Sequence, residues 1–311
     1  MQLPPSPYFN LQPVADGAWA ALAREGAGAW SNAGIVDLGG EALVIDTFFT
    51  PVAGAGLRNA AEALVGGPVR YVVNTHRHSD HVLGNQAFRD VPVIGTAATR
   101  RLIASETTEF VANVRAKPAF LDFMAQQAAI EENPVRRDDI MSFLGELRAL
   151  LADMPAEPLV LPSVICDGPL TIHGARRSAQ FLPLGAAHSP DDAAVYLPAE
   201  RVLFAGDLAQ VGFNSKFSDG DPEGWLRALD QLAGMAIDHV VPGHGTVGAA
   251  ADLAAMRTYI TDLKQLAATV DPAAKEPPAI PERYAAWHSP NVFIENLRFF
   301  AARNAKSARR N

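Results

Sequence analysis

The feature that most constrains this chain is a run of metal-ligand side chains in residues 74–81, Asn-Thr-His-Arg-His-Ser-Asp-His, which directly follows an apolar run at 71–73. Successive side chains of an extended chain point to opposite sides, so His76 and His78 are predicted to point the same way and to hold one cation. Imidazole nitrogens and carboxylate oxygens are donors that zinc and iron accept. The chain has eight histidines and three of them stand here, so we interpret the run as a metal site rather than a chance polar loop.

The end of this run predicts a second group of donors. Gly84 and the apolar Val82 and Leu83 indicate that the chain turns into a helix just after His81. That turn would aim Asp80 and His81 at a point beside the first one.

Composition narrows the class of protein. At 311 residues, 49% hydrophobic and 19% charged, the chain is typical of a globular protein, and we expect a single domain over residues 1–311. The net charge is −8 and no Lys/Arg block could follow a phosphate backbone, which disfavours nucleic acid as a partner. The single cysteine excludes an intrachain disulfide. No signal peptide or membrane-spanning run is visible, so we expect a cytoplasmic protein without a membrane partner.

The first half is predicted to form short strands and one crossover helix. Strands are expected at residues 10–14, 18–23, 35–38, 42–46, 69–74 and 91–94. A helix opens at Pro51 and runs to about Val65, where Gly66 closes it. The order strand, helix, strand implies a crossover connection and some parallel pairing.

Residues 97–158 differ in composition and are predicted to be a helical insertion between two β-rich halves. Ala, Leu, Glu, Arg and Gln dominate, and two or three helices are expected, broken near Pro118 and Pro134. Two interpretations stay open: the insertion covers the site, or it is a layer without ligand contact. Two also stay open for the Gly/Ala-rich loop 24–31: Trp30 contacts substrate from a flap, or it packs back on the sheet.

The second half repeats the β-rich pattern. Strands are expected at residues 159–165, 170–173, 180–184, 193–197, 202–205 and 239–241, with a helix at 222–233 and helices in the tail, residues 248–311. Two β-rich halves with helices outside predict an α/β fold in which two sheets face each other between helical layers.

Three further ligand types follow strands of the second half. His188, Asp207 and His244 are each expected just past the carboxyl end of an apolar strand, beside small residues that let the backbone approach closely. Together with the first run they would complete a site for two metal ions.

The order and spacing of these segments resemble the metallo-β-lactamase superfamily over roughly residues 14–248. The resemblance implies an αββα sandwich with a metal cleft at one sheet edge, and two zinc ions per chain, with iron or manganese as alternatives. It implies that one metal is held by His76, His78 and His188. It implies that the other is held by Asp80, His81 and His244, that Asp207 bridges the two, and that Asp46 supports the metal loop.

Several positions depart from well-known branches of the superfamily. Residues 187–192, Ala-His-Ser-Pro-Asp-Asp, replace two usual glycines around His188. Asp207 stands where the best-known lactamases carry a cysteine, and Gln210 stands where quorum-signal lactonases usually carry a tyrosine. No glutamate lies near His188, unlike in the alkylsulfatase branch. The resemblance therefore leaves the branch open.

The chemistry that the resemblance implies is hydrolysis of a small-molecule ester, lactone, thioester or cyclic amide by a metal-bridging hydroxide. Asp80 would orient the nucleophile and pass a proton to the leaving group. Alternatives are a β-lactamase proper, a persulfide dioxygenase with a single iron, a nuclease and a non-catalytic metal-binding protein. Trp30, Asn214 and Lys216 are candidate substrate contacts, and the amphipathic stretch 292–300 could form a homodimer contact.

Overall fold

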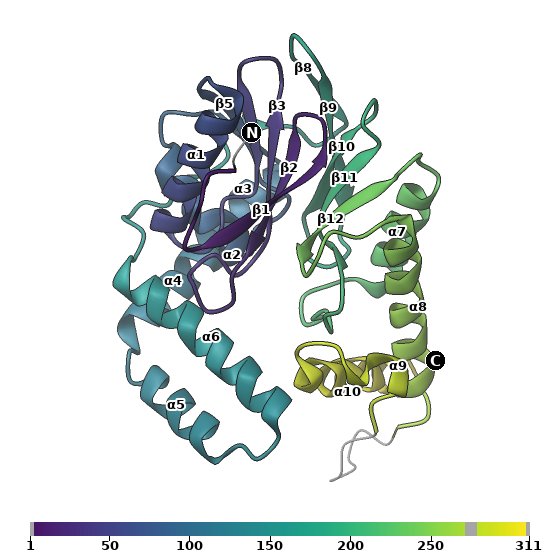
Figure 1. Ribbon diagram of the computed structural model, residues 1–311. Helices are drawn as coiled ribbons and strands as arrows, with labels where there is room; N and C mark the ends of the chain where they lie inside the picture. Colours follow the sequence, from purple (N-terminus) through teal and green to yellow (C-terminus); the bar gives the residue numbers. More distant parts are fainter. Residues whose placement is uncertain (1–2, 271–278, 309–311) are drawn as a thin grey trace.

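The computed structural model describes residues 3–270 and 279–308. Two β-sheets pack face to face between layers of helices (Figure 1). The first sheet contains, in spatial order, β1 (Phe9–Ala15), β2 (Ala18–Ala23), β3 (Ala33–Asp37), β4 (Ala42–Ile45), β5 (Val69–Val73), β6 (Val93–Gly95) and β7 (Val164–Ile165). Neighbours from β1 to β4 are antiparallel, and those from β4 to β7 are parallel.

The second sheet has five strands, and its strand ends complete the edge where the metal-ligand side chains gather. In spatial order these are β12 (His239–His244), β11 (Val202–Gln210), β10 (Asp192–Leu197), β9 (Ser178–Gly185) and β8 (Leu170–His173). β11 and β12 are parallel, and the other pairs are antiparallel. β5, β9, β11 and β12 therefore all deliver their carboxyl ends to one side of the sandwich. The predicted α/β sandwich is confirmed.

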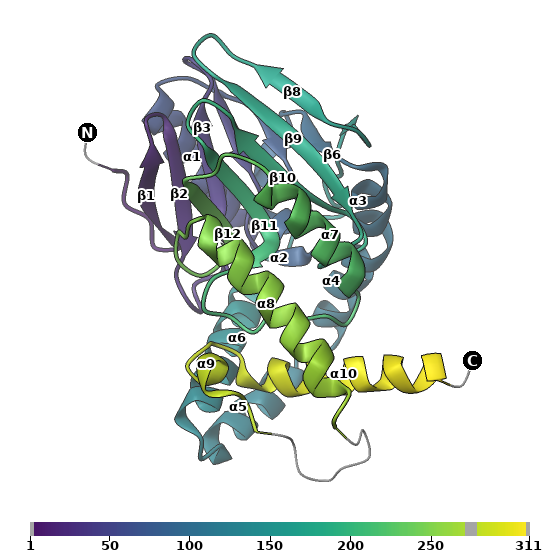
Figure 2. The same cartoon turned by 90° about the vertical axis from the view of Figure 1, so that its right-hand side faces the viewer.

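Apolar side chains fill each interface between layers. Val36, Leu43, Phe181 and Phe204 are among the buried residues between the sheets. The helix α1 (Pro51–Val65) covers the outer face of the first sheet. The outer face of the second sheet is covered by α7 (Pro222–Ala233) and α8 (Ala250–Ala267), while α10 (Pro290–Ala308) packs across the lower end of α8 with the short α9 (Glu282–Ala285) beside it (Figure 2).

Residues at the two ends of the crossover helix α1 explain where the helix begins and ends. Thr50 accepts a hydrogen bond from the Ala53 N–H at 3.2 Å, and Pro51 occupies the first turn, where its missing N–H costs nothing. Gly66 ends the helix at φ 72°, a left-handed conformation that favours glycine. The helix predicted at these residues is confirmed.

The helices of the insertion pack beside the metal-ligand run. They are α3 (Ala97–Leu102), a π-helical turn (Ile103–Thr107), α4 (Thr108–Ala116), α5 (Phe120–Ile130) and α6 (Pro134–Ala152). The breaks fall at the two predicted prolines. Leu144 and Leu147 of α6 belong to one buried cluster with Phe49, Val82 and Leu83, which flank the ligand run. β7 follows α6, so the insertion lies before the last strand of the first sheet.

Some predicted element boundaries were wrong. Of residues 159–165 only Val164 and Ile165 form a strand, since Pro162 has no N–H for a ladder. Asp207 lies within β11 rather than past its end, and His244 is the last residue of β12. The tail helix is interrupted between α9 and α10. Among the described residues, the structure has no helix that is long and apolar enough to cross a membrane.

Candidate metal centre

The fold brings the seven predicted ligand side chains to one edge of the sandwich. They form two groups whose donor atoms in each group lie within 4.8 Å of one another. The first group is His76, His78, His188 and Asp207, and the second is Asp80, His81 and His244. His76 and His78 follow β5, Asp80 and His81 lie on α2 (Ser79–Val82), and the other three come from the second sheet or the turn after β9.

In the first group, ring nitrogens and a carboxylate oxygen converge on one point. His76 Nε2 lies 2.9 Å from His78 Nδ1, and His188 Nε2 lies 3.1 Å from the same atom. Asp207 Oδ2 lies 3.2 Å from His188 Nε2. Tetrahedral zinc, about 2.0–2.1 Å from each donor, holds its donors roughly 3.3 Å apart. These separations therefore fit a single zinc-sized cation.

The second group lies on the other side of Asp207. Asp80 Oδ2 is 3.2 Å from His244 Nε2 and 3.5 Å from His81 Nε2. Asp207 Oδ1 is 3.3 Å from His81 Nε2, and Asp207 Oδ2 is 3.6 Å from His244 Nε2. The two oxygens of one carboxylate thus reach both groups.

Two buried atoms of this centre support the fit to metal. Among the described residues, His81 Nε2 and Asp207 Oδ1 are buried and have no hydrogen-bond partner. Buried polar atoms are normally satisfied, so such a pair calls for an explanation. A cation held by both atoms provides one, and the nitrogen and oxygen donor set suits zinc or iron. The role of the seven residues as ligands remains a prediction.

The charges at the centre are balanced by imidazoles in the metal-free protein. Burial acts to lower the pKa of His244, but Asp207 and Asp80 outweigh it and raise that pKa to about 10. Burial acts to raise the pKa of Asp207, but the neighbouring His244, His81 and His188 hold it well below its ordinary value. A metal ion would take the place of these protons, so metal binding should release protons and weaken as the pH falls.

Two glycines allow the second sheet to approach the ligand run. Gly206 has φ 52°, and a Cβ there would lie 2.7 Å from Thr75 Oγ1. A Cβ on Gly243 would lie 1.8 Å from Asp207 Oδ1. Side chains at either position would push Asp207 away from the histidines.

Asp46 is hydrogen-bonded to two residues of the ligand run, and its role in supporting bound metal remains a prediction. It follows β4 at φ 55°, a left-handed conformation that is uncommon for residues other than glycine. Its Oδ1 accepts from the Thr75 N–H at 2.8 Å, and its Oδ2 accepts from Thr75 Oγ1 at 2.7 Å. The same Oδ2 lies 2.8 Å from His81 Nδ1. If His81 Nδ1 carries the proton, Nε2 is left free to face the second group.

Asp219 contacts the ring of His78 as Asp46 contacts the ring of His81. Asp219 was not predicted from the sequence. Asp219 Oδ2 lies 3.0 Å from His78 Nε2, which leaves Nδ1 for the first group. The guanidinium of Arg77 also bonds Asp219 and lies 3.1 Å from Glu106 Oε2. Burial acts to raise the pKa of Asp219, but His78, His188 and Arg77 lower it well below its ordinary value. Asp219 is 141 positions from His78 and has no local signal beyond a polar turn.

The insertion is bonded directly to the ligand run. The Thr107 hydroxyl, on the π-helical turn, donates to the Arg77 carbonyl at 2.7 Å. Such turns are frequent at functional sites. The insertion therefore helps to hold the ligand run in place. This contact does not decide whether the insertion covers the site or is a layer without ligand contact.

Trp30 packs against the insertion helix α6 and against Phe49, which precedes α1. Its ring lies 4.9 Å from Phe49 and 5.0 Å from Phe143, between centroids, and the residue is half-buried. The next residue, Ser31, donates to the Asp80 carbonyl at 2.6 Å. Trp30 therefore packs against the insertion rather than back on the sheet, and its contact with substrate remains a prediction.

Glu146 of α6 is hydrogen-bonded to the loop that carries Trp30. Its Oε2 accepts from the Gly28 N–H at 2.7 Å, and the N–H groups of Gly26 and Ala27 also stabilise the carboxylate. The residue is 1% exposed, and burial raises its pKa to about 7 despite these bonds. A buried carboxyl that gains or loses its proton near neutral pH makes the anchoring of this loop sensitive to pH.

We expect Glu146→Gln to remove a pH dependence of stability. Between the unfolded pKa of 4.5 and about 7, the folded chain keeps a proton that the unfolded chain has lost, so the free energy of unfolding falls as pH rises. Relative to the Gln variant, the natural chain should lose up to roughly 3 kcal/mol over this window. Urea unfolding at pH 4.5 to 8 measures it. Glu132→Gln, at an exposed carboxylate, is the control, and parallel pH curves for all three chains would contradict the expectation.

The remaining candidate substrate contacts have different surroundings. Asn214 is 3% exposed, and its Nδ2 donates to the His288 carbonyl at 2.9 Å. Lys216 is exposed. Gln210 Nε2 donates to Asp207 Oδ2 at 2.8 Å and so touches the candidate bridging carboxylate. Asn214 is thus bonded to the C-terminal segment, and its contact with substrate remains a prediction, as does that of Lys216.

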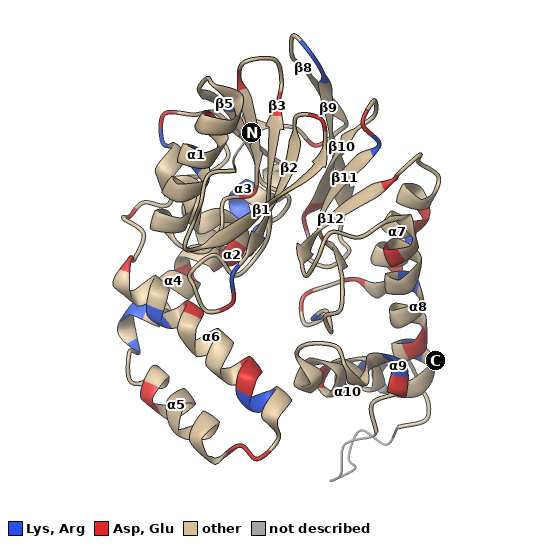
Figure 3. Ribbon diagram, viewed as in Figure 1, with Lys and Arg blue, Asp and Glu red and all other residues tan. Residues whose placement is uncertain are grey.

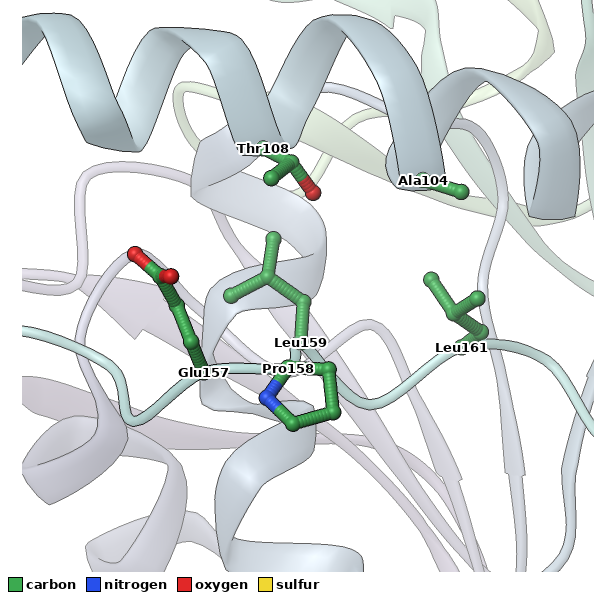
Figure 4. Close-up of a pocket in the computed structure, with 6 residues that line it drawn as sticks. All are labelled: Ala104, Thr108, Glu157, Pro158, Leu159 and Leu161. Carbon is green, nitrogen blue, oxygen red and sulfur yellow. The ribbon is translucent and has the colours of Figure 1, made fainter.

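A cavity of about 420 Å³ lies away from the metal-ligand side chains (Figure 4). It is lined by Ala104, Thr108, Glu157, Pro158, Leu159 and Leu161. None of the seven ligand residues lines it, so it does not define the substrate of the metal centre.

Comparison with known proteins identifies the family of the chain. Residues 31–244 match the metallo-beta-lactamase superfamily, and the chain belongs to that family. The predicted family is confirmed. A linear primary-alkylsulfatase from Pseudomonas sp. (strain ATCC 19151) is 26% identical over 187 residues, which are 57% of this chain and 34% of the relative. A metallo-beta-lactamase type 2 from Bacteroides fragilis is 29% identical over 119 residues, 37% of this chain and 47% of the relative.

Solved structures show the same fold. A metallo-beta-lactamase from Pontibacter korlensis superposes with a TM-score of 0.60 at 20% identity, over 82% of this chain and 99% of that one. The protein VMB-1 superposes with a TM-score of 0.59 at 18% identity, over 83% and 99%. The chain spans only about a third to a half of the two curated relatives' length. The prediction of a metallo-hydrolase agrees with the names of these two relatives, an alkylsulfatase and a metallo-beta-lactamase.

Proposed function

We propose that this chain is a hydrolase that uses two metal ions, zinc foremost, to cleave a small-molecule ester, lactone, thioester or cyclic amide. The observation that carries the proposal is the position of the Asp207 carboxylate, whose two oxygens lie 3.3 Å from His81 Nε2 and 3.2 Å from His188 Nε2, between two complete groups of donors. Two metal ions held by these residues would supply the chemistry of a dinuclear site, which activates water.

Bound metal ions would lower the pKa of a shared water towards neutrality and polarise the substrate's carbonyl oxygen. The protein's part is to orient donors and move protons. Asp80 keeps a lowered pKa, because His81 and His244 outweigh the burial that acts to raise it. Its carboxylate is therefore ionised at neutral pH and suited to take a proton from the nucleophile and pass it to the leaving group.

The second group of donors favours two metals over one. A dioxygenase with a single iron needs two histidines and one aspartate, which the first group already supplies. Asp80 and His81 are nevertheless buried beside His244, and Asp46 orients His81 at 2.8 Å. Burying polar donors in this way costs free energy unless they are satisfied, which supports a second ion.

β-Lactam hydrolysis is the second candidate, because a Bacteroides fragilis relative carries that name. Both candidates involve a small-molecule substrate. Acidic and basic residues are interspersed over the described elements (Figure 3). This distribution and the net charge of −8 support a small substrate over nucleic acid. A cytoplasmic location and a homodimer remain predictions.

The test is metal content per chain, by elemental mass spectrometry, on protein purified without added metal. We expect close to two zinc ions per chain and hydrolysis within a panel of lactones, thioesters, 4-nitrophenyl esters and β-lactams. Close to one iron and little zinc, with oxygen uptake on a glutathione persulfide, would overturn the proposal in favour of the dioxygenase. Turnover of β-lactams alone would select the second candidate.

A further inference from the structure

His288, an exposed histidine between α9 and α10, lies near the second group of donors. The His288 ring stacks on Phe213 with centroids 4.5 Å apart and planes at 20°. Phe213 in turn lies 5.9 Å from the His244 ring. Added together, the two centroid distances place the His288 ring within about 10 Å of the His244 ring. His288 also lies outside residues 31–244, which match the family, so the family assigns it no role.

The backbone of His288 is held firmly by the loop after β11. Its N–H donates to the Gly212 carbonyl at 2.9 Å. Its carbonyl accepts from the Asn214 N–H at 3.1 Å and from Asn214 Nδ2 at 2.9 Å. Since all three bonds use the backbone of residue 288, they leave its exposed imidazole free for another partner.

This residue also lies where the insertion meets the C-terminal segment. Burial raises the pKa of Asp139, on α6, and Asp139 lies close enough to Ser289 for the Ser289 N–H to act against that rise. Figures 1 and 2 show α6 and α9–α10 on the side of the sandwich to which the carboxyl ends of β11 and β12 point. A ligand bound at the strand ends therefore has His288 as a neighbour on the C-terminal side.

We propose that His288 is a substrate-contacting residue whose imidazole donates a hydrogen bond to a carboxylate on the substrate, at the end away from the scissile bond. The inference rests on the proposed hydrolase function and specifies its substrate class as anionic. The exposed imidazole supplies an N–H donor, and Lys216, exposed on the same loop as Phe213, supplies a positive charge. A donor and a cation at the strand ends of an otherwise acidic chain favour an anion.

The variant that tests this is His288→Phe. A phenyl ring keeps the stack on Phe213, and the three backbone bonds do not depend on the side chain, so the segment stays in place while its N–H donors are lost. The matched control is His239→Phe, an exposed histidine at the first residue of β12, which is the end away from His244.

Binding to the zinc-loaded protein is measured by calorimetry with adipate and hexanoate, which have the same chain length and differ by one carboxylate. We expect adipate to bind about tenfold more tightly than hexanoate to the natural chain and to His239→Phe, and the preference to vanish in His288→Phe. A preference that survives in His288→Phe, or that the natural chain lacks, would overturn the inference.

Kinetics separates this inference from the proposed function. For the 4-nitrophenyl half-ester of adipic acid, His288→Phe should raise KM about tenfold with little change in kcat, and 4-nitrophenyl hexanoate should be unaffected. If the natural chain hydrolyses neither ester nor the other substrates of the panel, the hydrolase proposal fails, while the binding preference for adipate still decides the role of His288.

Discussion

Replacing Asp207 with alanine is expected to abolish hydrolysis, with a loss of roughly a thousandfold or more in kcat/KM, because polarisation by metal supplies several kcal/mol of transition-state stabilisation. Metal content should fall as well, since the oxygens of this carboxylate reach both donor groups. Elemental mass spectrometry and rates on the best substrate of the panel measure the two effects.

The same change should also destabilise the metal-free protein by several kcal/mol, because His81, His188 and His244 would lose a buried negative partner. The control is Asp230→Ala, at an exposed carboxylate paired with Arg257 on the surface, which should keep full activity and metal content. An Asp207→Ala chain that still holds two metals and hydrolyses substrate would contradict the bridging role.

Asp46→Asn is expected to weaken metal binding by about 10- to 100-fold, although Asp46 is not itself one of the predicted metal ligands. Asparagine tolerates the left-handed backbone at φ 55° and can still accept from the Thr75 N–H. Its amide nitrogen cannot accept the proton of His81 Nδ1, which lies 2.8 Å from the present oxygen. The imidazole would turn or change tautomer, and the second group would be disturbed. Competition with a chromophoric chelator gives the affinity.

Asp37→Asn is the matched control for this prediction. Asp37 is also a buried carboxylate that accepts backbone N–H groups, those of Gly39 and Gly40, but it lies at the end of β3 paired with the start of β4, away from Asp46. Both variants should lose about 1–3 kcal/mol of unfolding free energy, and only Asp46→Asn should lose metal affinity. Equal losses of affinity would show that Asp46 acts through general stability alone.

Elements with local signals could be predicted from the sequence. The helix α1 is bounded by a capping threonine, a first-turn proline and a left-handed glycine, and each acts within a few residues. The strand β11 shows the limit of such signals. It runs on through Gly206 to Gln210, with irregular pairing to β12 at Gly206, so Asp207 sits in the strand and not past it. Pairing with a distant strand decides where a strand ends.

The ligand types and their order along the chain were determined by the sequence itself, because one run of residues carries the donors His76, His78, Asp80 and His81 in adjacent positions. The family resemblance already implied that Asp46 supports them, but only the tertiary structure decided which other side chains lie against the site. Asp219 reaches His78 across 141 positions, and His288 reaches Phe213 through a stack of rings. The physical reason is that donor chemistry belongs to the residue type, whereas orientation depends on contacts between segments that are neighbours only after folding.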